Sequence, residues 1–165
     1  MHPDYRRILA LVSLDRVGLA VARAAAGEVR HAGARLALGH VVDWATEWGC
    51  DDFSVLTPQE LEQRLKVVVS RQITALAGRI GIPDAASLVA FGGPERGLGE
   101  LARSWQPDLV VVDNARFGDL AAGGVVRLQG WECDALAVET GGIGSRRLRD
   151  LARMAWLSPL PHWPR

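Results

Sequence analysis

A loop rich in small and polar residues follows an apolar run at 108–113. The stretch reads DLVVVDNARFGDLAAGG, so Asp113 closes the apolar run and Gly118, Gly123 and Gly124 follow it. Glycines in such a loop let backbone N–H groups come close to phosphate oxygens. The chemistry suggested is phosphate binding. Asp113 opposes it, because two like charges at 4 Å repel by about 1 kcal/mol in water and by more at lower dielectric.

Catalytic and metal-binding interpretations are weaker. Ser13 and His40 with an aspartate would suit a hydrolytic triad, but no nucleophile elbow of the form G-x-S-x-G is present. His40 lies within an apolar run, which favours a structural role. The acidic stretch from Asp43 to Asp52 lacks the ligand spacing of a metal loop. We therefore expect neither a catalytic constellation nor a metal site.

Composition limits the remaining classes. The chain has 165 residues and is 48% hydrophobic, which favours one compact domain. Its net charge is zero, but five arginines against one aspartate give residues 141–165 a charge of +4, leaving −4 on residues 1–140. The acidic body argues against nucleic acid as a partner. No apolar run approaches the roughly 20 residues that span a bilayer, so we expect a cytoplasmic protein.

Strands and helices alternate along the chain. Helical periodicity follows the first strand and ends at Gly33, and a Thr57–Glu60 capping box opens a long helix that Gly81 closes. A third helix is expected at 94–105 and a weaker one within 117–131. Such alternation predicts an α/β fold with an open, doubly wound parallel sheet and helices on both faces. The five strands are expected at 6–13, 34–44, 86–92, 108–113 and 134–139.

This arrangement resembles the universal stress protein family. The stretches RRILALVSLD and GARLALGHVVD are similar to its first two strands, GGPERGLGELARSWQPDLVVVD to its Gly-led helix and next strand, and CDALAVE to its final strand. The resemblance covers about residues 4–140. It implies the strand order 3-2-1-4-5, with a ligand beyond the carboxyl ends of the first and fourth strands.

The family's nucleotide signature is degenerate in this sequence. ATP-binding members carry an aspartate near the end of the first strand, where this chain has Ser13, two residues before Asp15. They also carry a G-x-x-G-x9-G-[ST] pattern, whose first two glycines fall on Asp113 and Arg116. The resemblance therefore implies a non-catalytic regulatory or stress-response protein without a cofactor or tight ATP binding. The alternative is an ATP- or AMP-binding module with a rearranged loop, using Ser13, Asp15, Val41, Asp113, Arg116, Gly118, Gly123 and Gly124.

Two interaction surfaces are expected. The fifth strand would be a sheet edge, which proteins pair or cover, and the resemblance implies a homodimer through Leu136, Ala137 and Val138. Residues 141–165 form an extension beyond the 1–140 domain, with a short basic amphipathic helix and a Pro- and Trp-containing end. We expect it to pack on its own acidic domain, with a protein partner second and a membrane surface third. Its contact residues would be Arg146, Leu148, Arg149, Leu151 and Trp156.

Overall fold

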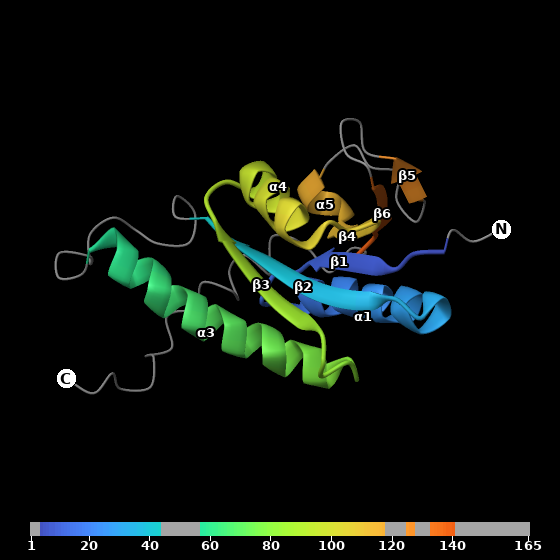
Figure 1. Cartoon of the computed structure of the whole chain (residues 1–165), viewed down its shortest axis with the longest axis horizontal. Helices are drawn as coiled ribbons and strands as arrows, with labels where there is room; N and C mark the ends of the chain where they lie inside the picture. Colours follow the sequence, from blue (N-terminus) through green and yellow to red (C-terminus); the bar gives the residue numbers. More distant parts are fainter. Residues whose placement is uncertain (1–3, 44–56, 118–124, 128–132, 141–165) are drawn as a thin grey trace.

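The sheet has the predicted doubly wound order. The computed structural model describes residues 4–43, 57–117, 125–127 and 133–140. Five parallel strands follow one another as β3-β2-β1-β4-β6 (Figure 1), which is the predicted order 3-2-1-4-5. These strands are β1 (Arg7–Leu11), β2 (Arg35–Val42), β3 (Ala86–Phe91), β4 (Leu109–Asp113) and β6 (Asp134–Val138).

Helices cover both faces of this sheet. Two long helices, α1 (Arg16–Ala32) and α3 (Pro58–Arg79), pack on one face, and α4 (Pro94–Trp105) packs on the other (Figure 1). The boundary signals act as predicted. Gly33 ends α1 in the left-handed conformation with φ 67°, and Thr57 and Glu60 form the reciprocal capping box of α3.

Strand alternation divides the core into two layers. On β1, Ile8 and Ala10 face α1 and α3, whereas Leu9 and Leu11 face α4. Every residue of β4 is buried, as expected for a central strand covered on both sides. The resulting rigid sheet fixes the positions of the loops at its two edges.

The last part of the sheet differs from the prediction. A short strand, β5 (Val125–Arg127), pairs antiparallel with β6 on its outer side. The predicted helix within 117–131 is therefore wrong at 125–127, and β6 is not the sheet edge along its first three residues. The reason is local: Val125 and Val126 are β-branched, and pairing them with β6 satisfies backbone groups that an edge would leave open.

Candidate functional site at the carboxyl edge of the sheet

The strand order reverses between β1 and β4. These strands are hydrogen-bonded neighbours, with Ala10 opposite Val111, while α1 and α4 leave the sheet on opposite faces. Loops beyond the carboxyl ends of two such strands diverge and leave room for a ligand. The structure therefore brings the end of β1, with Ser13 and Asp15, to the same edge as Asp113, as the sequence predicted.

The Asp15 side chain caps the first turn of α1. Its Oδ1 accepts a hydrogen bond from the Ser13 hydroxyl at 2.5 Å and another from the backbone N–H of Gly18 at 3.0 Å. This is an N-cap, which satisfies one of the open N–H groups at a helix start. The Asp15 carboxylate thus occupies the positive end of α1, where an anion would otherwise find free donors.

The loop between β1 and α1 lies directly against the helix. A Cβ atom built on Gly18 would stand 1.6 Å from the carbonyl oxygen of Ser13, a distance that no side chain tolerates. Only glycine therefore permits this approach of loop and helix. This close approach holds Ser13 and Asp15 at the carboxyl edge of the sheet.

Asp113 closes the end of β4. Its side chain is only 8% exposed, and Oδ1 accepts a hydrogen bond from the Thr140 hydroxyl at 2.8 Å. The next residue, Asn114, begins the short helix α5 (Asn114–Phe117), and its Oδ1 is buried without a donor among the described residues. Sequence reasoning missed Thr140. The parallel register that places Asp113 opposite Val138 was the available signal, because Thr140 lies just beyond.

His40 and Val41, near the carboxyl end of β2, are both buried. His40 is 3% exposed, and its Nδ1 lies 2.8 Å from the carbonyl oxygen of Val12, so this nitrogen donates. Ser13 instead donates to Asp15, so the described contacts do not join Ser13 and His40 into a triad. Val41 is buried against α4, where a Cβ on Gly97 would approach its Cγ1 to 2.4 Å. The structural interpretation of His40 agrees with these contacts.

The structure describes only some of the remaining predicted site residues. Arg116 lies in α5, and Leu136, Ala137 and Val138 lie on β6. In the described ranges, no three side chains of the metal-ligating types gather in one place. The predicted residues that lie outside the described ranges are the loop glycines Gly118, Gly123 and Gly124, the acidic stretch from Glu47 to Asp52, and the tail residues Arg146, Leu148, Arg149, Leu151 and Trp156.

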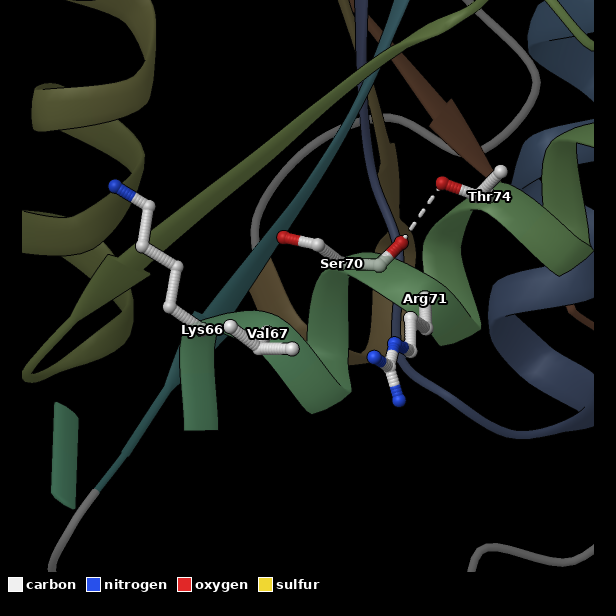
Figure 2. Close-up of a pocket in the computed structure, with 5 residues that line it drawn as sticks. All are labelled: Lys66, Val67, Ser70, Arg71 and Thr74. Carbon is white, nitrogen blue, oxygen red and sulfur yellow. Dashed lines mark hydrogen bonds between the residues drawn. The ribbon is translucent and has the colours of Figure 1, made fainter. Parts of the chain in front are cut away.

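An open hollow lies elsewhere, on the outer surface of α3. Its described lining consists of Lys66, Val67, Ser70, Arg71 and Thr74, with the Thr74 hydroxyl donating to the Ser70 carbonyl oxygen (Figure 2). None of these residues belongs to the carboxyl edge. The hollow therefore adds nothing to the candidate ligand site. Within the described segments, no helix combines the length and apolar character needed to cross a membrane.

Solved structures share this fold. A universal stress protein in complex with cAMP is 20% identical, with a TM-score of 0.57 over 84% of this chain and 100% of that chain. A universal stress protein family member from Burkholderia pseudomallei is also 20% identical, with a TM-score of 0.54 over 84% and 98% of the two chains. UspA from Lactobacillus plantarum is 15% identical, with a TM-score of 0.52 over 84% and 100%.

The sequence itself carries the family signal. No curated protein is significantly similar to the chain. The model of the universal stress protein family, however, matches residues 4–126, which is most of the sequence and includes β1 through β4 with both loops of the carboxyl edge. The chain therefore belongs to the universal stress protein family.

Proposed function

We propose that this chain is a non-catalytic regulatory or stress-response protein of the cytoplasm, which acts through protein contacts and does not bind ATP tightly. The observation that supports this proposal best is the position of Asp113. Its carboxylate is buried at the end of β4 and held by Thr140, where ATP-binding relatives have the first glycine of their phosphate loop.

Electrostatics at this edge oppose a triphosphate. Asp15 caps α1, Asp113 closes β4, and Asp43 and Glu139 directly follow β2 and β6. A phosphate about 4 Å from one carboxylate is repelled by about 4 kcal/mol at an effective dielectric of 20. A triphosphate brings several such charges, so its binding requires compensating cations or Mg²⁺.

The proposal is tested on the purified protein. Mass spectrometry after denaturation detects any co-purified nucleotide, and thermal unfolding is followed with millimolar ATP and Mg²⁺. We expect no co-purified nucleotide and no rise in melting temperature. A ligand at 100 times its Kd adds about 2.7 kcal/mol of stability, so a tight site would be visible. Stabilisation by several degrees contradicts the proposal.

An Asp113→Asn variant isolates the charge. The amide oxygen still accepts from Thr140, so we expect the fold to persist while ATP affinity rises by about fivefold or more, because one repulsion of at least about 1 kcal/mol is removed. Glu139→Gln is the matched control, since it removes an exposed carboxylate one residue after β6. An equal gain in both variants would show a general charge effect rather than a role for Asp113.

A smaller nucleotide is the second candidate function. Asn114 Oδ1 is a buried acceptor without a described donor, and an adenine amino group or a ribose hydroxyl would satisfy it. The relative solved with cAMP supports testing a monophosphate, which carries less charge than ATP. Calorimetric titration with AMP and with cAMP tests this candidate. Binding that Asn114→Ala weakens supports it, and the absence of heat for both ligands rejects it.

The homodimer through β6 remains part of the proposal in a modified form. β5 pairs with Asp134, Ala135 and Leu136, which leaves only the outer edge of Ala137 and Val138 without a partner among the described strands. A dimer through this strand therefore has to use its carboxyl end or displace β5. Sedimentation of the wild type and of Val138→Lys tests this interface. A dimer that Val138→Lys dissociates supports it, and a monomeric wild type rejects it.

A further inference from the structure

Two arginines stand side by side at the opposite edge of the sheet. Arg7 and Arg35 are register partners at the start of β1 and β2, so their side chains leave the same face. Both reach the indole of Trp105, the last residue of α4: the Arg7 Cζ lies 4.8 Å and the Arg35 Cζ 5.4 Å from the ring centroid. These cation–π contacts gather two positive charges around one aromatic ring.

Two N–H groups of this cluster have no acceptor among the residues that the structure describes. Trp105 is 9% exposed, and its Nε1 is buried without a hydrogen bond to any described residue. The Nε of Arg7 is likewise buried without a hydrogen bond to any described residue. Buried donors are nearly always paired in folded proteins, so two unpaired donors on contacting side chains call for an acceptor that no described residue supplies.

The carboxylates of this edge are engaged elsewhere. Asp108 accepts from the backbone N–H groups of Arg6 and Arg7 at 2.8 and 2.9 Å, and Asp134 accepts from the Tyr5 hydroxyl at 3.0 Å. The carbonyl end of α4 offsets part of the positive charge through its dipole. It supplies no acceptor to Arg7 Nε or Trp105 Nε1 in the described structure.

Like charges placed directly opposite on neighbouring strands repel. The Arg7–Arg35 pair therefore favours a counter-ion with two negative charges and several acceptor oxygens. Guanidinium forks match phosphate in geometry, and a phosphate group carries a charge of about −1.5 to −2 at pH 7. We propose that Arg7, Arg35 and Trp105 form a binding site for a phosphate dianion, supplied as free phosphate or as a phosphate monoester. This site is separate from the carboxyl edge and independent of the function proposed for it.

The test uses the indole N–H of Trp105 in the full, ¹⁵N-labelled chain. Trp105→Phe identifies its signal among the six tryptophans of the sequence by removing it. The protein is titrated with inorganic phosphate and with phosphoserine, each against potassium chloride at matched ionic strength. We expect a saturable shift of this signal in the low millimolar range or tighter. Saturation by phosphate alone supports free phosphate as the source, and tighter saturation by phosphoserine supports a monoester.

Two substitutions make the result specific. Arg35 is exposed, so Arg35→Gln preserves folding and is expected to weaken phosphate binding at least about tenfold. Arg23→Gln removes an exposed arginine from α1, on the other face of the sheet, and is expected to leave the affinity unchanged. The proposal is overturned if phosphate and phosphoserine shift the Trp105 signal no more than chloride does, or if Arg35→Gln binds phosphate as the wild type does.

Discussion

At the scale of single residues, two glycines of α1 have opposite steric surroundings. The Cβ of an alanine at Gly18 would collide with the Ser13 carbonyl oxygen at 1.6 Å, whereas a Cβ at Gly27 meets nothing within 4 Å. Backbone has to move to relieve the first collision. Gly18→Ala is therefore expected to lower the free energy of unfolding by about 3 kcal/mol, at the upper end of overpacking costs. Urea unfolding measures this change.

Gly27→Ala is the matched control, since it makes the same substitution in the same helix. Gly27 is exposed, so alanine adds helix propensity without a clash and is expected to stabilise the protein by about 0.5–1 kcal/mol. Equal effects of the two substitutions would mean that the close approach of the β1–α1 loop to the helix does not constrain Gly18.

Tyr5 provides a second residue-scale prediction, on pH dependence. Burial raises the pKa of its hydroxyl to about 12, and the hydrogen bond to Asp134 and the charges of Asp134, Glu28 and Asp108 add to this effect. An unfolded tyrosine has a pKa of about 10. The folded state thus keeps its proton more tightly, and this contribution to stability is full below about pH 10 and is lost as the pH rises through 12.

Tyr5 is the only tyrosine in the chain, so tyrosinate absorbance reports its titration directly. We expect a midpoint near pH 12 in the wild type and a lower one in Asp134→Asn, which removes the nearest negative charge. Glu62→Gln, on α3, is expected to leave the midpoint unchanged, because Glu62 is not among the groups that raise the pKa. A wild-type midpoint at pH 10 contradicts the burial of Tyr5.

At the scale of elements, the start of α3 depends on its capping box. The Thr57 hydroxyl accepts from the Glu60 N–H at 3.3 Å, and the Glu60 carboxylate accepts from the Thr57 N–H at 2.9 Å. Thr57→Ala removes the first of these and is expected to cost about 1 kcal/mol of unfolding free energy. Thr74→Ala is the control, because Thr74 lies mid-helix and its hydroxyl returns to the Ser70 carbonyl oxygen. It is expected to be neutral or slightly stabilising in the same urea experiment.

The elements were more predictable than the contacts between them. Continuous apolar runs, Gly33 and the Thr57–Glu60 box locate the parallel strands and long helices, because each signal is local in the chain. β5 was missed because three residues carry little periodicity and their strand form depends on pairing with β6. The Asp113–Thr140 bond was missed for a related reason, since it joins residues 27 apart through the sheet register.

At the scale of the whole molecule, the two edges of the sheet differ in charge. The carboxyl edge carries Asp15, Asp43 and Asp113 on its strand ends and first turns, whereas Arg7 and Arg35 meet at the amino edge, near Asp108 and Asp134. A phosphate that bound beyond the carboxyl ends of the strands would meet these three carboxylates. The family fold is thus retained, and the carboxylates at its carboxyl edge are the basis of our proposal that this edge disfavours polyanions.

The last prediction concerns the 141–165 extension, whose charge of +4 matches the −4 of residues 1–140. If the extension packs on its own domain, truncation after Thr140 leaves a cooperatively folding chain with a melting temperature several degrees lower. Attraction between exposed charges is largely screened when they are more than about 8–10 Å apart at 0.1–0.15 M salt. At 1 M salt the same screening already applies beyond about 3 Å. The decrease in melting temperature caused by truncation is therefore expected to be smaller in 1 M salt than in low salt. Calorimetry of the full-length and truncated chains at the two salt concentrations measures this difference in melting temperature. Identical melting temperatures of the two chains at low salt would instead favour an external partner for the extension.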